Sequence, residues 1–541
     1  MERDFTAGYL SYPRPVTVAA RRLATPSSVN AAIKQIADVM RRANYAGALQ
    51  YVPELSWILF LRILDEREEL EAEEAEALGV GFMPSLEPPY RWRDWASPGG
   101  AKRVELSEGA MGAFLPFVNS ELLPYLRGLR DRPNASTRQR VISEVVSAVD
   151  KVDVDTERNL LDILDRVDEI HLEAVDQTHL FTLSQAYEGL LQKMGEKNND
   201  GGQFFTPREV IRAIVRAVDP KVGETVYDPG CGTGGFLAQA FEWMRAGLGP
   251  GATAEQLRVL REDTFFGREK ADIVYPIALA NLVLHGIDHP HIWHGNTLTG
   301  QTTYGGLFAG APALFDVVLM NPPFGGKEGK EAQTNFAYKT GATQVLFLQH
   351  VIDSLKPGGR CGLVIDEGVL FRNNETAFVQ TKRKLLNDCD LWCIVSLPPG
   401  VFSSAGAGVK TNLLFFTKGG PTEKVWYYDL SDVKVTKKQP LTLDRFAEFF
   451  SLLPARADSD HSWMVTRDEI EAHRFDLKAV NPNAKSTEDT RTPEELIDII
   501  EAKGREVDAA MADLRRMLGV DASGGALGPS GADQQAKHPS G

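Results

Sequence analysis

One short stretch of the chain combines residue types that could do chemistry together. The mostly apolar run Phe315–Met320 has the length and composition of a buried strand, and Asn321-Pro322-Pro323-Phe324 follows it directly. Because proline fixes φ, two prolines in succession make the backbone after Asn321 rigid. The turn therefore predicts two hydrogen-bond acceptors at a fixed separation, namely the side-chain oxygen of Asn321 and the main-chain carbonyl of Pro322.

Two such acceptors suit an amine that is attached to an aromatic ring. The lone pair of that amine is delocalised into the ring, which makes the nitrogen a poor nucleophile. If each acceptor takes one amine hydrogen, the nitrogen becomes tetrahedral and its lone pair points toward a donor group. Phe324 could stack on a base that has left its duplex, because a base amine is inaccessible inside the stack. A rigid loop without chemistry is the alternative for this turn.

The donor in this scheme has to be activated already, since proximity and alignment then carry the rate without a covalent nucleophile. The sequence contains no Pro-Cys dipeptide, which argues against the enzymes that attack a cytosine ring through cysteine. The expected reaction is therefore direct transfer of an activated group to the amine.

A glycine-rich turn after a second predicted strand could hold that donor. Thr225–Asp228 leads into Pro-Gly-Cys-Gly-Thr-Gly-Gly, residues 229–235. Glycine permits positive φ and a close approach of a ligand to the backbone. No Gly-Lys-Ser/Thr follows, so the turn is not a Walker A loop, and the glycine spacing disfavours a dinucleotide fingerprint. A tight turn that only packs a helix against a sheet remains the alternative.

These motifs need strands that end side by side. Between residues 193 and 430, short apolar runs alternate with helical patterns, which predicts an α/β domain with a mostly parallel sheet covered on both faces. Ligands of such sheets bind beyond the carboxyl ends of the strands. The predicted strands are Thr225–Asp228, Thr264–Gly267, Phe315–Met320, Gly362–Ile365, Trp392–Ser396 and Asn412–Phe416.

The flanking regions are predicted to be helical. Their expected bounds are an arm at 1–26, a helical domain at 27–192, a C-terminal region at 431–520 and a disordered tail at 521–541. A first helix capped by Ser28 would place Ile33, Ile36 and Met40 on one face, and a second would begin near Glu54. In that second helix, Trp57, Leu61 and Leu64 share one side.

Two further helical features carry predictions. The glutamates between Glu68 and Glu76 are expected to form a solvated helix face, with a basic partner as the alternative. Thr492, Pro493 and Glu495 form a capping box that begins the last helix. Apolar residues follow near heptad spacing and could dock a partner or pack on their own domain. They are Leu496, Ile500, Val507, Ala510, Leu514 and Met517.

Charge and composition limit the possible partners. The 541 residues carry a net charge of −15, which is the wrong sign for a chain that holds DNA alone, because lysine and arginine supply that affinity. The chain must concentrate its basic residues locally or rely on a partner for its grip. Four cysteines, no signal-peptide core and no membrane-spanning run predict a cytoplasmic protein without disulfides.

The turn at 228–235 resembles the first motif of class I S-adenosylmethionine methyltransferases, in the Asp-Pro-x-Cys-Gly-Thr-Gly-Gly-Phe form of adenine-specific DNA enzymes. This resemblance implies a Rossmann-like fold and S-adenosyl-L-methionine as methyl donor. It assigns to the cofactor Asp228, Gly230, Thr233, Gly234 and Gly235. Asp228 would anchor the loop, and residues 233–235 would lie along the methionine end of the cofactor.

Two later strand ends complete the expected cofactor pocket. Glu269 ends the sequence Phe-Gly-Arg-Glu, and its carboxylate could accept two hydrogen bonds from ribose hydroxyls. It lies far from the first motif because Ala246–Glu262 has the pattern of an inserted loop and helix. Asn296, in the sequence His-Gly-Asn-Thr-Leu, either approaches the adenine ring of the cofactor or forms a plain turn.

An upstream segment precedes a helix predicted over Glu209–Val218. A helix N-terminus presents free amides and a positive dipole, which suits the carboxylate of the cofactor. The residues predicted to bind the cofactor here are Gln203, Phe204, Phe205, Thr206, Pro207 and Arg208. Thr206 as an ordinary N-cap, with Pro207 at the first helical position, is compatible with that role.

With these motifs placed, the chain from Val29 to about Met517 resembles the modification subunit of type I restriction–modification systems, with the motif order of γ-type amino-methyltransferases. The shared stretches include residues 55–62, 202–208 and 474–477, the last followed by 481–483. Residues 397–402, followed by 411–414, resemble a late motif that helps to shape the pocket of the target base. The resemblance implies methylation of adenine N6 in DNA, a separate specificity subunit that reads the sequence, and an ATP-driven restriction subunit. It also implies two modification subunits for each specificity subunit.

Other interpretations remain open at this stage. A protein-glutamine or RNA N-methyltransferase would use a similar turn around an equally delocalised nitrogen, and a non-catalytic assembly component could retain the fold. A metal site is not expected. His285, His289, His291 and His294 lack acidic or thiolate partners at ligand spacing, and Cys389 and Cys393 lack a second pair.

Overall fold

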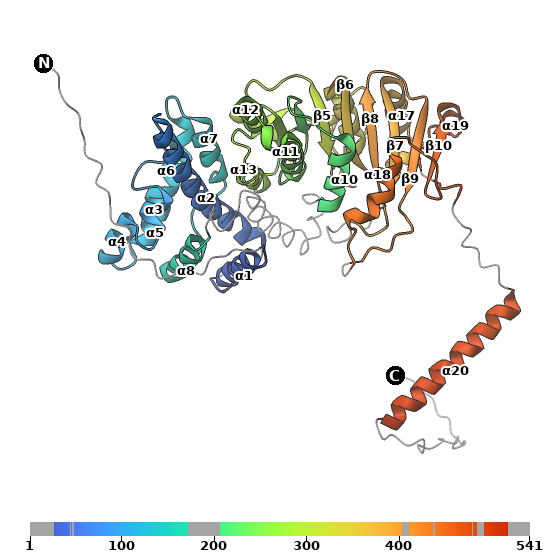
Figure 1. Ribbon diagram of the computed structural model, residues 1–541, viewed down its shortest axis with the longest axis horizontal. Helices are drawn as coiled ribbons and strands as arrows, with labels where there is room; N and C mark the ends of the chain where they lie inside the picture. The colour runs from blue at the N-terminus through green and yellow to red at the C-terminus, as the bar shows by residue number, and fades with distance from the viewer. Residues whose placement is uncertain are drawn as a thin grey trace, which may run out of the picture. The chain divides into compact units, whose positions relative to one another are not determined.

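The computed structural model describes residues 26–43, 45, 48–170, 206–402, 410–436, 439–478, 480–483 and 492–517. Contacts divide the chain into two compact units, Met1–Asn483 and Ala484–Gly541. The first unit contains a sheet, the helices around it and a group of N-terminal helices; the second contains α20, Pro493–Met517 (Figure 1).

A ten-stranded sheet positions the motifs, with the strand order β10-β9-β7-β8-β6-β5-β1-β2-β3-β4. The strands are β1 Val226–Asp228, β2 Phe265–Glu269, β3 His291–Asn296, β4 Gln301–Tyr304, β5 Phe315–Met320, β6 Leu355–Asp366, β7 Cys389–Ser396, β8 Thr411–Lys418, β9 Lys424–Asp429 and β10 Ser462–Thr466. Strands β3, β2, β1, β5 and β6 pair in parallel, while β4, β8 and β10 run the opposite way. The loops after β1, β2, β3, β5, β6 and β7 therefore emerge at one edge.

The predicted α/β architecture is confirmed, and each of the six predicted strands overlaps a strand of the sheet. The sheet continues beyond the predicted domain boundary at residue 430, because β10 pairs with β9 in antiparallel register. The first compact unit ends at Asn483 instead. Strand β10 is short and mixed in polarity, so its sequence carries little strand signal.

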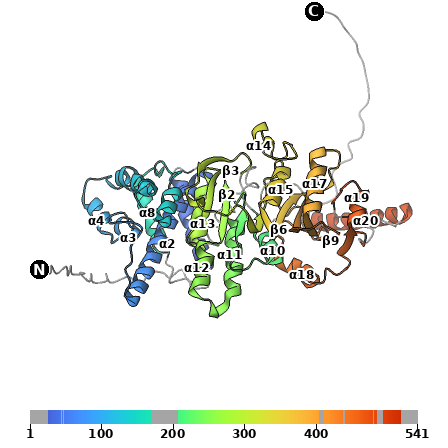
Figure 2. The same ribbon diagram turned by 90° about the horizontal axis from the view of Figure 1, so that it is seen from above.

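Helices cover both faces of the sheet. One face packs against α10 Arg208–Val218, α11 Gly235–Leu248, α13 Val274–Leu284 and α18 Ala447–Leu452. The other packs against α15 Thr343–Ser354, α17 Thr376–Asp388 and α19 Arg467–Ala472. Figure 2 separates these two layers. Alternation along β5 explains them, since Val317 and Leu319 join one core while Val318 and Met320 join the other.

Smaller helices fill the connections of the sheet region. They are α12 Ala254–Glu262, α14 Lys330–Thr334 and α16 Glu367–Phe371. The predicted insertion at 246–262 is confirmed as the end of α11, a short 3₁₀ turn and α12. It lengthens the path from the glycine-rich turn to β2 without disturbing the pairing of β1 with β2.

The N-terminal helices are α1 Pro26–Arg42, α2 Ala48–Leu78, α3 Trp92–Trp95, α4 Ala101–Glu108, α5 Phe114–Phe117, α6 Leu123–Arg127, α7 Thr137–Val145 and α8 Glu157–Asp168. Helix α1 begins before the predicted cap Ser28, and α2 begins before the predicted start at Glu54. Pro53 lies inside α2 because burial of Tyr51 and Val52 outweighs its missing hydrogen bond. Helices α2 and α7 contact α13 of the sheet region.

The acidic end of α2 is only partly the solvated face that its sequence predicts. Arg138 on α7 bonds Glu71 through two nitrogens, at 2.7 and 3.0 Å, and reaches Glu68 at 3.3 Å. Glu68 also accepts from the Ser85 amide and is buried. The remaining glutamates at 69, 73, 74 and 76 are exposed, as predicted. An arginine that is distant in sequence therefore decides which carboxylates turn inward.

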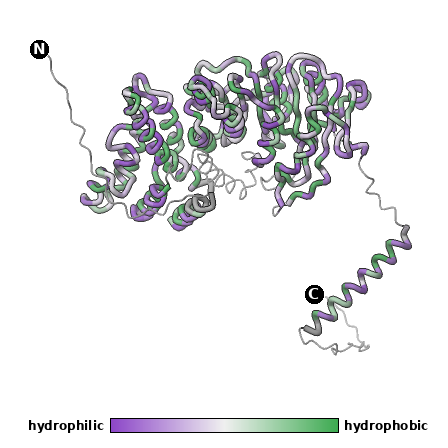
Figure 3. The backbone as a smooth tube through the Cα atoms, in the orientation of Figure 1, coloured by the Kyte–Doolittle hydropathy of each residue, from purple (hydrophilic) through white to green (hydrophobic). Residues whose placement is uncertain are grey.

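Helix α20 begins as predicted. The Thr492 hydroxyl accepts from the Glu495 amide at 3.2 Å, and the Glu495 carboxylate accepts from the Thr492 amide at 2.8 Å. Hydrophobic and hydrophilic residues alternate along the helix (Figure 3). Across the described ranges, no helix combines the length and apolar character that a bilayer crossing requires.

Candidate active site

Asn321 lies at the carboxyl end of β5, between β1 and β6. Its side-chain nitrogen donates to the hydroxyl of Thr206 at 3.0 Å. Its side-chain oxygen Oδ1 is buried and has no hydrogen-bond partner among the described residues. A buried acceptor without a partner is costly, so this atom is prepared for a donor that comes from outside the chain.

The second predicted acceptor lies next to the first. Pro322 is buried, and its carbonyl accepts from the Gln344 side-chain nitrogen at 3.4 Å. Because a carbonyl oxygen has two lone pairs, this long bond leaves one of them open. The strand and the proline pair thus present two acceptors with spare capacity on adjacent residues.

Phe324 meets an aromatic residue from the end of another strand. Its ring packs edge-to-face with Phe402 at 5.3 Å between centroids, with an interplanar angle of 76°. Phe402 belongs to the stretch 397–402 after β7, and it is buried. Two strand ends that are distant in sequence therefore place aromatic rings beside the Asn-Pro-Pro turn.

The upstream segment differs from its prediction in one respect. Helix α10 begins at Arg208, with Pro207 at the N-cap position and no side-chain cap. Thr206 therefore is not the N-cap, because its hydroxyl accepts from Asn321 instead. Arg208 forms the first turn of α10, while Gln203, Phe204 and Phe205 lie outside the described residues.

The glycine-rich turn after β1 packs closely against neighbouring side chains, and Gly234 has a backbone conformation that favours glycine. A Cβ on Gly230 would meet the Met320 methyl at 2.9 Å, and Gly234 has a φ of +81° with Leu282 at 3.1 Å. The Asn281 amide supports the turn from α13 by donating to the Thr233 carbonyl at 2.8 Å. Gly235 then begins α11. The backbone of the turn is thus held in place and open to a ligand on its free side.

Two buried carboxyl groups lie beside this turn, Asp228 at the end of β1 and Glu269 at the end of β2. The Asp228 side chain accepts from the Gly230 amide at 3.1 Å, which ties the turn to the end of β1. Burial raises the pKa of Asp228 to about 8, against the bond from Gly230, and the charge of Glu269 adds to the increase. Asp228 is therefore mainly protonated at neutral pH, and the pair avoids two adjacent buried charges.

Glu269 has most of its hydrogen-bonding capacity occupied. One oxygen accepts from the amides of Lys270 and Ala271, and the other from the amide of Gly232 at 2.9 Å. Burial raises the pKa of Glu269 although these amides favour its charged form. A carboxylate offers about four lone-pair sites, so one remains for a ligand without rearrangement. If Glu269 accepted both predicted hydrogen bonds from the ribose, one of the backbone amides that now donate to it would lose its bond.

A cavity of about 240 Å³ joins these motifs at the sheet edge. Gly230, Glu269 and Asn296 line it from the ends of β1, β2 and β3, and Pro323 and Phe347 close it. Asn296 also stabilises its own turn, since its side-chain oxygen accepts from the Leu298 amide at 3.0 Å. The glycine-rich turn and the Asn-Pro-Pro turn thus share one cavity, although the sequence separates them widely.

Residues that sequence reasoning missed also line this cavity. Arg268 lies with its guanidinium over the rings of Trp293 and Phe308, at 4.6 and 5.2 Å from their centroids. Phe347 comes from α15, whose sequence reads only as an apolar helix. Arg268 could have been noticed because it directly precedes Glu269 at a strand end; Phe347 offers no comparable signal.

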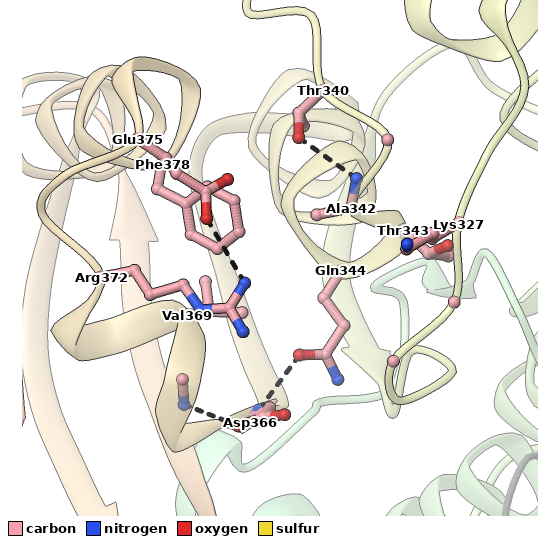
Figure 4. Close-up of a pocket in the computed structure, with 14 residues that line it drawn as sticks. Lys327, Thr340, Ala342, Thr343, Gln344, Asp366, Val369, Arg372, Glu375 and Phe378 are labelled. Carbon is pink, nitrogen blue, oxygen red and sulfur yellow. Dashed lines mark hydrogen bonds and ion pairs between the residues drawn. The ribbon is translucent and has the colours of Figure 1, made fainter.

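A second cavity, of about 420 Å³, adjoins the first (Figure 4). It shares Gly326, Lys327 and Thr343 with the first cavity. Gln344 reaches from α15 across this space, and its side-chain oxygen accepts from the Asp366 amide at 3.2 Å. Gln344 therefore connects the end of β6 to the carbonyl of Pro322.

The histidines that were considered as metal ligands make separate contacts. His291 bonds the carbonyls of Glu262 and Leu307, whereas the His294 ring lies with its Nε2 3.1 Å from a carboxylate oxygen of Asp272 and stacks on Tyr275. In the part of the chain that the structure describes, no three ligand-type side chains group around a common point.

Comparisons with known proteins give the family of this arrangement. The chain matches the N-6 DNA Methylase family over residues 178–491 and the HsdM N-terminal domain family over residues 29–161. The EcoEI type I restriction enzyme methylase subunit of Escherichia coli is 34% identical over 518 residues, which are 92% of this chain and 99% of that protein.

Solved structures agree with these matches. A modification subunit attributed to a type I restriction enzyme of Vibrio vulnificus YJ016 is 33% identical with a TM-score of 0.73, covering 85% of this chain and 98% of that one. A chain from a study of complex assembly and conformational transition in the type I R-M system is 37% identical with a TM-score of 0.70, covering 92% and 100%.

Proposed function

The chain belongs to the N-6 DNA methylase family and, within it, to the methylase subunits of type I restriction enzymes, and from this premise we propose that Asn321–Phe324 is the catalytic turn. One observation carries the proposal. The buried Asn321 oxygen has no partner among the described residues, and the adjacent Pro322 carbonyl has a free lone pair. These two atoms accept the hydrogens of the adenine N6 amine.

The alternatives to this activity gain nothing from the comparisons. The matching family is one of DNA methylases, and the relatives are named methylase subunits, rather than protein or RNA methyltransferases. A non-catalytic assembly component would not need a buried acceptor left open at a strand end.

The cavity between the turns is suited to S-adenosyl-L-methionine. Glu269 offers an acceptor to a ribose hydroxyl, and Pro323, Leu298 and Phe347 offer apolar faces to a flat ring. The backbone of the glycine-rich turn lines the cavity directly at Gly230. When bound, the cofactor supplies a methyl group on a sulfonium, which is already activated for transfer.

The residues of this chain then orient the target base. Asn321 and Pro322 each accept one amine hydrogen, so the nitrogen becomes tetrahedral and its lone pair is no longer delocalised into the ring. Phe324, supported from behind by the buried Phe402, packs against the flipped base, which cannot react while it is stacked in the duplex. Proximity and alignment supply the rate, and no covalent intermediate on the protein is required.

Partners supply what this chain lacks. A net charge of −15 is unfavourable for holding a duplex alone, so a specificity subunit provides sequence recognition and much of the grip on DNA. Helix α20 offers the docking surface, because Ile497, Ile500, Val507, Met511 and Leu514 are all exposed on it. An ATP-driven restriction subunit and two methylase chains for each specificity subunit complete the proposed assembly.

The experiment replaces Asn321 in the full chain assembled with its specificity subunit. Asn321→Ala removes one acceptor and should lower methyl incorporation into DNA by about 100- to 1,000-fold. Cofactor binding, measured by calorimetry, should survive, because Asn321 does not line the cofactor cavity. Asn387→Ala, at an exposed position on α17, is the matched control and should methylate normally. Near-normal methylation by Asn321→Ala would refute the proposal.

A further inference from the structure

The two acceptors of the catalytic turn are each held by a side chain from a different element. Thr206 precedes α10 and contacts Asn321, while Gln344 lies in the first turn of α15 and contacts Pro322. Helix α10 covers one face of the sheet and α15 covers the other. The turn is thus supported from both sides of the sheet at once.

The contact with Thr206 determines which way the Asn321 amide faces. Asn321 donates through its nitrogen at 3.0 Å, and its oxygen remains buried without a partner among the described residues. A hydroxyl can also donate. If the Asn321 amide were rotated the opposite way, its oxygen would accept from the Thr206 hydroxyl, and its nitrogen would face the substrate. Only the observed orientation offers an acceptor to an amine.

Thr206 can hold this orientation while it serves the cofactor. A threonine hydroxyl has one proton to donate and two lone pairs, and Asn321 uses one lone pair. If the hydroxyl proton is donated to the carboxylate of the cofactor, Thr206 cannot donate to the Asn321 oxygen. The two contacts are therefore compatible, and donation to the cofactor carboxylate would reinforce the observed orientation of the Asn321 amide.

Gln344 holds the other acceptor in a similar way. It is only 4% exposed, and its oxygen accepts from the Asp366 amide at 3.2 Å. That bond fixes the side-chain nitrogen on the opposite side, where it donates to the Pro322 carbonyl at 3.4 Å. Its direction is thus set by the end of β6, and it takes one lone pair of the carbonyl while leaving the other.

From this juxtaposition we propose that Thr206 and Gln344 are positioning residues for methyl transfer: Thr206 turns the Asn321 oxygen toward the target amine, and Gln344 sets the direction of the Pro322 carbonyl. The proposal rests on the proposed function of the Asn321–Phe324 turn. Neither residue needs to touch the base, since each acts through the acceptor that it binds.

The test of Thr206 compares two variants in the full complex with DNA. Thr206→Val keeps the shape and removes the hydroxyl, whereas Thr206→Ser keeps the hydroxyl. At saturating cofactor and DNA, Thr206→Val should lower the single-turnover rate about tenfold or more, and Thr206→Ser should restore it to within about threefold. Fluorescence of 2-aminopurine at the target position should remain normal in both variants, because base flipping does not depend on the amide orientation.

A purely cofactor-binding role for Thr206 gives a different result. Thr206→Val would then raise the Kd for S-adenosylmethionine, measured by calorimetry, and saturating cofactor would restore the full rate. That restoration would overturn the proposal for Thr206. If Thr206→Val misfolds, it will lose cofactor binding and show a lowered Tm. Thr206→Ser then tests the proposal, because a variant that keeps the hydroxyl must keep its activity.

The test of Gln344 separates its two bonds. Gln344→Glu still accepts from the Asp366 amide and cannot donate to the Pro322 carbonyl once its buried carboxyl is ionised, so its rate is compared across pH and read where it has ionised, whereas Gln344→Met makes neither bond at any pH. Because the bond is long, Gln344→Glu should lower the saturated rate only about fivefold, with Gln344→Met at least as slow. A normal rate for Gln344→Glu would assign Gln344 to the support of β6 alone and refute its positioning role.

Asn321→Ala, measured in the same assay, distinguishes the two levels of failure. If Asn321→Ala is inactive and Thr206→Val keeps its saturated rate, the positioning proposal fails while the proposed function stands. If Asn321→Ala itself remains active, the proposed function fails, and the positioning proposal fails with it.

Discussion

The sheet edge and helix α20 each have groups whose contacts are not satisfied, but these groups are polar at the sheet edge and apolar on α20. At the sheet edge the apolar residues are covered, and a buried polar atom, the Asn321 oxygen, lacks a partner among the described residues. On α20 the polar groups reach solvent, and apolar side chains such as Ile500 and Val507 are exposed by 69% and 60%. A buried open acceptor calls for a small polar ligand, whereas an exposed apolar face calls for another protein.

The largest expected effect in this comparison concerns the aromatic part of the sheet edge. Phe324→Ala removes the ring that packs against Phe402, and should lower kcat/KM for DNA methylation by about 10- to 100-fold, as loss of base stacking does. Phe324→Tyr keeps the ring and should retain most activity. Methyl incorporation by the assembled complex is the measurement, and equal activities of the Ala and Tyr variants would remove Phe324 from the base pocket.

The second effect concerns the exposed face of α20. Ile500→Asp combined with Val507→Asp places charges on that face, and should weaken association with the specificity subunit about tenfold or more. Cofactor binding by the isolated chain should not change. Arg505→Asp, at an exposed position on the opposite face of the same helix, makes an equal change of charge and is the control for added negative charge. Unaltered association, measured by analytical ultracentrifugation, would mean that α20 is not the docking helix.

The smallest effect concerns the buried carboxyl of the glycine-rich turn. The pKa of Asp228 is raised to about 8, so the folded chain binds a proton that the unfolded chain loses near pH 4. Its burial therefore costs little stability at low pH, and the cost grows as pH rises toward 8.

Asp228→Asn keeps the acceptor for the Gly230 amide and removes this titration. The Tm of the variant relative to the parent should therefore rise by a few degrees between about pH 5 and about pH 8. Thermal unfolding at several pH values measures it. A constant difference in Tm would mean that Asp228 is ionised in the folded chain.

Sequence reasoning succeeded where neighbouring residues decide the structure. The capping box at Thr492 and Glu495, the strand Phe315–Met320 and the insertion at 246–262 all depend on local patterns, and the structure contains each of them. It was less successful at Thr206, where a local N-cap pattern gave way to a bond with Asn321, 115 residues away. Beyond the boundary predicted at residue 430, β10 joins the sheet through pairing rather than through its own strand pattern.

The residues of the candidate site also fall into those that local sequence patterns indicate and those that only tertiary packing reveals. The residue types and spacing of the turns at 228–235 and 321–324 were sufficient to indicate their chemistry, because proline and glycine restrict or free the backbone wherever they occur. Gln344, Phe347 and Arg138 gave no comparable signal. Each lies on a helix whose pattern says that one side is buried, without saying against which residue.

The sequence by itself determined that this protein carries two strand-end turns with the chemistry of methyl transfer, in an α/β frame with helical flanks. The tertiary structure decided that the two turns share one cavity, and which atoms of the catalytic turn are already bonded and which are open. The physical reason is that backbone preferences act between adjacent residues, whereas hydrogen-bond partners are assigned by strand order and helix packing, which bring distant segments together.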